Sequence, residues 1–113
     1  MRLEFLCQAE RKQLHEAPHS ARALWLERLS LLLASRDLPA TPYWVRMAGS
    51  ALEAGSIYLR ACEQPQQSDV ENFLTTATKL IALLSCLSET RLAMIVFSGV
   101  DSLLKERALA TLV

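Results

Sequence analysis

The sequence predicts an all-α protein, an up-and-down helical bundle of four to five helices that forms a single domain over residues 1–113. Hydrophobic residues make up 51% of the chain, and the helix formers leucine (22) and alanine (15) dominate them. Glycine (3) and proline (4), which interrupt helices, are rare. This composition excludes a disordered chain, and three cysteines are too few for a disulfide-dense secreted scaffold.

Prolines divide the chain where helical periodicity stops, at Pro18, at Pro39 and Pro42, and at Pro65. The first helix is expected over residues 2–16 and is amphipathic. Its apolar side carries Leu3, Leu6, Cys7 and Leu14.

The second helix is expected over residues 20–36, and apolar residues cover more than half of its circumference. These residues are Leu24, Trp25, Leu26, Leu29, Leu31, Leu32 and Leu33. A helix with so wide an apolar surface must be covered on two sides. We therefore expect it to be the central helix of the bundle, or to meet a second chain.

The third helix is expected to begin at Thr41 and Pro42, a capping residue followed by a proline at the first helical position, and to run to about residue 64. Its apolar seam alternates large and small residues: Val45, Ala48, Leu52, Gly55, Leu59 and Cys62. We expect a neighbour to pack closely there and to compensate for Gly49 and Gly55, each of which costs a helix about 1 kcal/mol. The residues expected away from this seam are Arg46, Glu53, Arg60 and Glu63.

The fourth helix is expected to begin with a capping box from Ser68 to Glu71. Its apolar stripe consists of Val70, Phe73, Leu74, Ala77, Leu80, Ile81, Leu84 and Leu87. The residues expected to face solvent are Glu71, Asn72, Thr75, Thr76 and Lys79.

The last segment, about residues 89–111, is apolar on all sides over residues 92–97. This run could form a buried strand, but a lone strand would lack a partner, so we predict a buried helix. Neither glycine nor proline lies between Pro65 and Gly99. Residues 68–111 are therefore compatible with one long helix or with two, with Ser88 as a weak boundary.

Charge and segment lengths limit the partners and the compartment. Twelve basic and twelve acidic residues cancel, and no basic stripe is visible, so we expect no nucleic-acid partner. No uncharged stretch reaches the roughly 18 residues of a membrane span, and the first residues lack the apolar core of a signal peptide. We expect a cytoplasmic protein in which Cys7, Cys62 and Cys86 are small buried hydrophobes.

One motif suggests chemistry: residues 15–19 fit the pattern H-E-x-x-H, which in zinc peptidases places two histidines one helical turn apart. Pro18 works against the continuous helix that this geometry requires. Cysteine–histidine pairs have no supporting signature. The acidic candidates Glu53, Glu63, Glu71 and Glu89 are expected on solvated helix faces. We therefore predict no catalytic residue, no metal site and no cofactor.

The function expected from these observations is a non-enzymatic interaction module, an adaptor, regulator or chaperone-like protein. It would self-associate, as a homodimer, and bind an apolar helix of a partner protein. The surplus apolar residues of the second helix and of the first half of the fifth are expected to contact another chain. The expected partner-binding residues are Leu24, Leu31, Tyr43, Trp44 and Arg46.

Two alternatives remain open. One is a small metal-dependent enzyme or metal-binding protein that uses His15 and His19. The other is a helix-turn-helix DNA-binding regulator, which would need a recognition helix with exposed basic or amide side chains.

Overall fold

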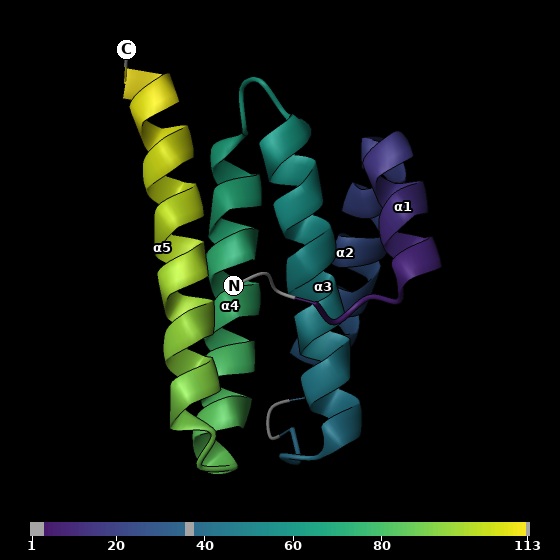
Figure 1. Cartoon of the computed structure of the whole chain (residues 1–113), viewed down its shortest axis with the longest axis vertical. Helices are drawn as coiled ribbons and strands as arrows, with labels where there is room; N and C mark the ends of the chain where they lie inside the picture. Colours follow the sequence, from purple (N-terminus) through teal and green to yellow (C-terminus); the bar gives the residue numbers. More distant parts are fainter. Residues whose placement is uncertain (1–3, 36–37, 113) are drawn as a thin grey trace.

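The computed structural model describes residues 4–35 and 38–112, with side chains up to residue 106. These residues form five helices and no strand, which confirms the all-α prediction. The helices are α1 (Gln8–Glu16), α2 (Pro18–Leu33), α3 (Pro42–Ala61), α4 (Gln67–Cys86) and α5 (Thr90–Leu112). Successive helices run in alternating directions, so the α2–α3 connection and the α4–α5 turn lie at the same end of the bundle (Figure 1).

The start of α3 agrees with the sequence prediction. Pro42 is the first helical residue, and Oγ1 of Thr41 accepts a hydrogen bond from the backbone N–H of Trp44 at 3.4 Å. The carbonyl of Thr41 accepts a second bond, from the N–H of Val45 at 3.0 Å. This cap fixes the start of α3 at Pro42 and therefore the position of the first turn, which carries Tyr43 and Trp44.

The predicted capping box of the fourth helix is wrong. α4 begins earlier, at Gln67, because the carbonyl of Gln66 accepts hydrogen bonds from the N–H groups of Asp69 and Val70, both at 3.1 Å. Ser68 is therefore already inside the helix and caps nothing. Asp69 is buried and forms an ion pair with Arg22 of α2 at 3.0 Å instead of facing solvent at the helix start.

The segment after Pro65 forms two helices, joined by a turn over residues 87–89. The N–H of Glu89 donates to the carbonyl of Leu84 at 2.8 Å, and the N–H of Ser88 donates to that of Ser85 at 3.0 Å. Ser88 has a φ of 60°. These features define a Schellman motif in which serine occupies the left-handed position that glycine usually takes. Of the two arrangements left open, the structure has two helices with the boundary at Ser88, and the last segment is helical as predicted. The expectation that residues 92–97 are buried on all sides is wrong, because Met94 and Phe97 are exposed.

Ser88→Gly is expected to raise the free energy of unfolding by about 0.5–1 kcal/mol. The left-handed conformation costs a residue with a Cβ atom roughly 1–2 kcal/mol, and glycine avoids this cost. Part of the gain is offset because glycine loses more backbone entropy on folding than serine does. Urea denaturation followed by circular dichroism measures the difference. Ser85→Gly, inside α4, is the control and should lower the stability. A loss of stability in both variants would contradict the role assigned to the turn.

α3 is the central helix, since it packs against every other helix. Residues 48–57 of α3 are buried around the full circumference of the helix. Of the two expectations for the second helix, the central position is wrong, and contact with a second chain stays a prediction. α2 buries only the side that carries Ala21, Trp25, Leu29 and Leu32, because a helix covered on one side buries residues spaced three and four apart. Its remaining leucines stay half-buried or exposed.

The small residues of α3 are packed closely, as predicted. A Cβ atom at position 55 would lie 3.0 Å from the ring of Trp25 and 3.1 Å from that of Phe73. At position 49 it would overlap the ring of Phe5. Glycine at these positions allows side chains from α2, α4 and the N-terminal segment to reach the backbone of α3.

Two side chains that the sequence placed on polar faces are buried. Thr76 is fully buried because its hydroxyl accepts a hydrogen bond from the indole N–H of Trp25 at 3.0 Å and donates to the carbonyl of Asn72 at 2.7 Å. Glu53 is 5% exposed, on the side of α3 that the N-terminal segment covers. Both are satisfied by partners distant in the sequence, which explains how they occur in the core.

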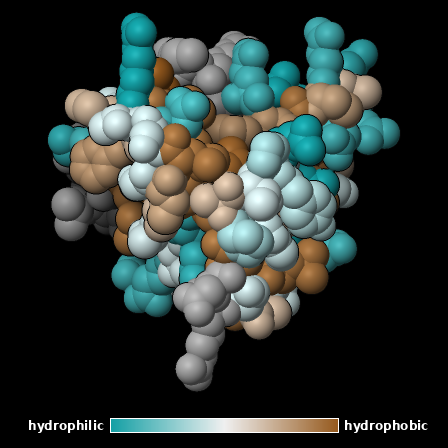
Figure 2. All heavy atoms as spheres, turned by 90° about the horizontal axis from the view of Figure 1, so that it is seen from below, coloured by the Kyte–Doolittle hydropathy of each residue, from teal (hydrophilic) through white to brown (hydrophobic). Residues whose placement is uncertain are grey.

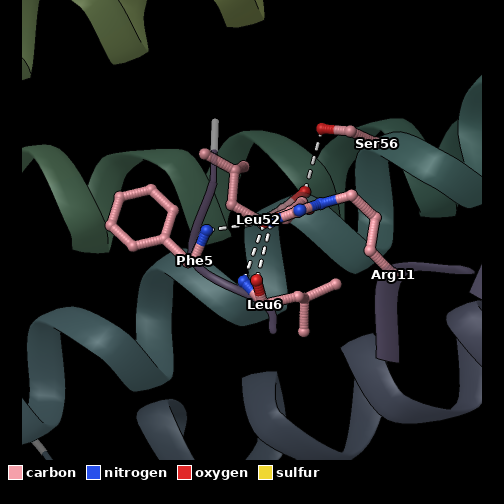
Figure 3. Close-up of polar contacts among 6 residues, drawn as sticks. Phe5, Leu6, Arg11, Leu52 and Ser56 are labelled. Carbon is pink, nitrogen blue, oxygen red and sulfur yellow. Dashed lines mark hydrogen bonds and ion pairs between the residues drawn. The ribbon is translucent and has the colours of Figure 1, made fainter. Parts of the chain in front are cut away.

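The carboxylate of Glu53 holds the N-terminal segment across α3 (Figure 3). Its Oε1 accepts hydrogen bonds from the backbone N–H groups of Phe5 at 2.6 Å and Leu6 at 2.9 Å. Arg11 forms an ion pair with the same carboxylate and donates to the carbonyl of Leu6 at 2.7 Å. The hydrogen bond to Glu53 raises the pKa of Arg11.

Because Glu53 holds residues 5 and 6, the helix expected from residue 2 begins only at Gln8. Residues 2 and 3, and residue 36 of the expected second helix, lie outside the described residues.

A second polar group joins α2, α3 and α4. The guanidinium of Arg22 binds Asp69 through two hydrogen bonds, at 3.0 and 3.3 Å, and lies 5.7 Å from the ring centre of Tyr58. The hydrogen bond to Asp69 raises the pKa of Arg22, and burial raises the pKa of Tyr58. These contacts lie at the end of the bundle opposite the α4–α5 turn and account for the burial of Asp69.

Candidate protein-binding surface

The structure brings the predicted aromatic and basic residues together at the start of α3. Tyr43 is 56% exposed, and its ring meets that of Trp44 edge-on, with 5.2 Å between the ring centres. Trp44 is half-buried against the core, and Arg46 is exposed. One of the two adjacent rings is thus presented to solvent while the other anchors the turn.

The other predicted contact residues lie on α2. Leu24 is half-buried against the core, whereas Leu31 is exposed. They are spaced four and three residues from Arg28, so all three lie along one side of the helix. Arg28 connects this side of α2 to the start of α3, because it lines the same hollow as Tyr43 and Arg46.

The hollow has a volume of about 240 Å³ and is open to solvent. It is lined by Phe5, Arg28, Tyr43, Arg46, Met47 and Ser50. The hydroxyl of Ser50 donates to the carbonyl of Met47 at 3.0 Å. Four of these residues were not predicted from the sequence. Phe5 and Arg28 come from the N-terminal segment and from α2, distant parts of the chain, whereas Met47 and Ser50 follow Arg46 on α3. Gly49 was the available signal, since close packing at that position is what admits Phe5.

Both charged residues of the hollow are cations. Arg28 has one acidic neighbour among the described residues, Glu10 of α1, at 3.8 Å, and the Glu10 side chain is nearly half exposed. Such a long and solvated pair contributes little to stability. The hollow therefore combines two guanidinium groups with the apolar surfaces of Phe5, Tyr43 and Met47.

Large apolar side chains are exposed at the end of the bundle that carries the α4–α5 turn, which we call the apolar end. They belong to the last turn of α2, the first turn of α3, the α4–α5 turn and the first third of α5: Leu31, Leu33, Tyr43, Leu87, Met94 and Phe97. Figure 2 views this end and shows hydrophobic side chains at the surface between hydrophilic ones. Leu74, on the first half of α4, is the other large apolar residue exposed among the described side chains.

The apolar surplus is located partly where the prediction placed it, on α2 and in the first half of α5, but Leu74 and Leu87 of the stripe predicted for the fourth helix are exposed as well. Met94 is 69% exposed and Phe97 is 63% exposed, both in the first half of α5. Leu31 and Leu33 of α2 are also exposed. α5 packs on α4 and α3 with one side only, which leaves Met94 and Phe97 on its outer side.

The histidine pattern lacks the continuous helix that a zinc-peptidase geometry requires. α1 ends at Glu16 and α2 begins at Pro18, with the intervening Ala17 at φ −136° and ψ 77°. His15 and His19 are both exposed, His15 in the last turn of α1 and His19 in the first turn of α2, which begins two residues earlier than expected. Within the described part of the chain, no three His, Cys, Asp or Glu side chains gather as a metal site would require.

The expectation of buried cysteines is wrong for two of the three. Cys7 and Cys86 are exposed, and Cys62 is half-buried. Cys7 directly precedes α1 and Cys86 ends α4, so both lie at helix ends that the core does not cover. Cys62 directly follows α3, and its proximity to Tyr58 contributes to the raised pKa of that phenol.

The fold and this surface define a class of structure, an all-helical bundle with a partly cationic hollow beside an apolar end. Comparisons with protein-family models, with curated proteins and with solved structures gave no match to this chain. Among the described helices, none combines the length and the apolar character needed to cross a membrane.

Proposed function

We propose that the protein is a non-enzymatic interaction module that binds a helix of a partner protein and self-associates. The observation that carries this proposal is that six of the seven large apolar side chains exposed among the described residues lie at the apolar end. Exposed apolar surface that is concentrated in one region, rather than scattered, is typical of a protein-binding surface. Tyr43, exposed in this region on the first turn of α3, is of a residue type that often dominates binding energy.

The size and charge of the chain support self-association through the same end. A protein of 113 residues buries only a moderate fraction of its apolar surface by itself, and a second copy would cover part of the remainder. The formal net charge is zero, so two copies experience no long-range repulsion. The dimer that we propose places Leu33, Leu87, Met94 and Phe97 of two copies against each other around a two-fold axis and leaves Tyr43 and the hollow beside it free for a partner helix.

The test compares the wild-type protein with the double variant Leu33→Ser/Met94→Ser by light scattering at micromolar concentration. We expect the wild type to be a dimer and the variant to be a monomer, because both side chains lie at the apolar end and are more than half exposed. Binding of a dye for apolar surfaces should fall in the variant. Exposed substitutions of this kind usually change the folding free energy by less than about 0.5 kcal/mol, so the fold should persist.

Leu74→Ser is the matched control, because it also removes an exposed leucine but lies on α4 away from the apolar end. It should leave the dimer intact. A wild-type protein that stays monomeric and binds no dye would overturn the self-association. Equal dissociation in the control and the double variant would show that the apolar end is not the interface.

A further inference from the structure

We propose that the hollow lined by Phe5, Arg28, Tyr43, Arg46, Met47 and Ser50 binds an acidic side chain, aspartate or glutamate, from a helix of a partner protein. An apolar residue of the same partner helix would pack on Tyr43. This inference rests on the proposed function and specifies the chemistry of its partner.

The charge of the hollow favours an anionic group. Its two ionisable side chains that carry charge at neutral pH, Arg28 and Arg46, come from α2 and α3, so two guanidinium groups border one opening. A guanidinium binds a carboxylate through paired hydrogen bonds that are stronger than those between neutral groups. The first turns of α3, which contribute Tyr43 and Arg46, also carry the positive end of the helix dipole.

The existing neighbour of Arg28 can be exchanged for a ligand. Glu10 lies 3.8 Å from the guanidinium, beyond ordinary hydrogen-bond distance, and its side chain is 45% exposed. If Arg28 turned towards a carboxylate in the hollow, it would therefore lose only the weak ion pair with Glu10 and gain a direct ion pair with the ligand. By contrast, Arg11 and Arg22 are held by the buried carboxylates of Glu53 and Asp69.

The size of the hollow indicates that its ligand is a side chain of a partner and not a cofactor. Its volume of about 240 Å³ lies below the roughly 300–1,000 Å³ that is typical of small-molecule sites. The surface next to it is apolar, since Tyr43 is exposed at its edge and Leu31 lies one turn from Arg28 on the same side of α2. A carboxylate in the hollow with an apolar neighbour one helical turn away matches this arrangement, and an amphipathic helix supplies both.

The test selects binders from a displayed library of helical peptides with randomised exposed positions. We expect the selected peptides to share an aspartate or glutamate beside apolar residues. Their affinity should fall at least about tenfold when the acidic residue is changed to its amide, and equally when the protein carries Arg28→Gln/Arg46→Gln, because each change removes charged hydrogen bonds. Binding should also weaken as the salt concentration rises.

Arg60→Gln is the matched control: it lies on the last turn of α3, is exposed, and does not line the hollow. It should bind the peptides like the wild type. Circular dichroism and thermal unfolding of the double variant verify that it is folded.

The outcomes separate this inference from the proposed function. Peptides that bind the double arginine variant unchanged but lose affinity for Leu33→Ser/Met94→Ser would overturn the inference and retain the interaction module. Failure to select any peptide would overturn both. A single-stranded oligonucleotide that displaces the peptides, and that requires both arginines, would assign the hollow to nucleic acid and also overturn the inference.

Discussion

Trp25→Ala is expected to lower the free energy of unfolding by about 3–5 kcal/mol, the largest effect of any single substitution considered for this protein. The side chain is fully buried. Its ring lies edge-on to Phe73, with 6.3 Å between the ring centres, and 6.4 Å from the ring of Tyr58. Removing it leaves a cavity between α2, α3 and α4 that the tightly packed backbone at Gly55 cannot fill. Urea denaturation followed by circular dichroism measures the loss.

Trp25→Phe separates packing from hydrogen bonding in this experiment. It retains most of the apolar contact but removes the indole N–H that Thr76 accepts at 3.0 Å. Thr76 keeps its bond to the carbonyl of Asn72, so the cost should be well below that of alanine. If Trp25→Ala lost less than about 1 kcal/mol, far below the usual range for such truncations, the description of Trp25 as the centre of the core would be wrong.

Glu53→Ala is expected to lower the free energy of unfolding by about 2–4 kcal/mol. The substitution removes the acceptor of the Phe5 and Leu6 amides, and a buried N–H without a partner costs about 1–3 kcal/mol. It also removes the partner of Arg11. The N-terminal segment should then separate from α3, so hydrogen exchange at the amides of Phe5 and Leu6 should accelerate together with the loss of stability.

Two comparisons make the Glu53 prediction specific. Glu63→Ala removes an exposed carboxylate just after α3 and should change stability by less than about 0.5 kcal/mol. Glu53→Gln keeps an acceptor oxygen and should give an intermediate loss. Unchanged exchange rates at Phe5 and Leu6 in Glu53→Ala would contradict the proposed attachment of the N-terminal segment.

The helices could be predicted from the sequence because their signals are local. Proline positions, the Thr41–Pro42 start and the three-and-four spacing of apolar residues depend on neighbouring residues only. The boundaries that were wrong have non-local causes. The first helix starts late because Glu53, more than forty positions away, binds Phe5 and Leu6. The predicted cap at Ser68 is also wrong, because the next residue, Asp69, lies inside the helix and binds the distant Arg22 of α2.

The same distinction explains the candidate site. Tyr43 and Arg46 could be predicted because a local motif places them at an exposed helix start. Phe5 and Arg28 join them only through packing between elements, which no periodicity encodes. Glu53 and Thr76 were placed on solvated faces because a polar residue on a helix usually faces water, and their partners could not be identified before the helices were assembled.

The position of Phe5 links the hollow to the N-terminal segment thermodynamically. Its ring packs on the backbone at Gly49 and forms one wall of the hollow, while its amide is held by Glu53. A ligand that contacts Phe5 therefore stabilises the closed segment against local opening. By reciprocity, the closed segment increases the affinity of the hollow for that ligand by the same free energy. Ligand binding in the hollow and attachment of the N-terminal segment to α3 are therefore coupled equilibria. Because Glu53 holds the segment, a substitution at Glu53 should change both the attachment of the segment and the affinity of the hollow.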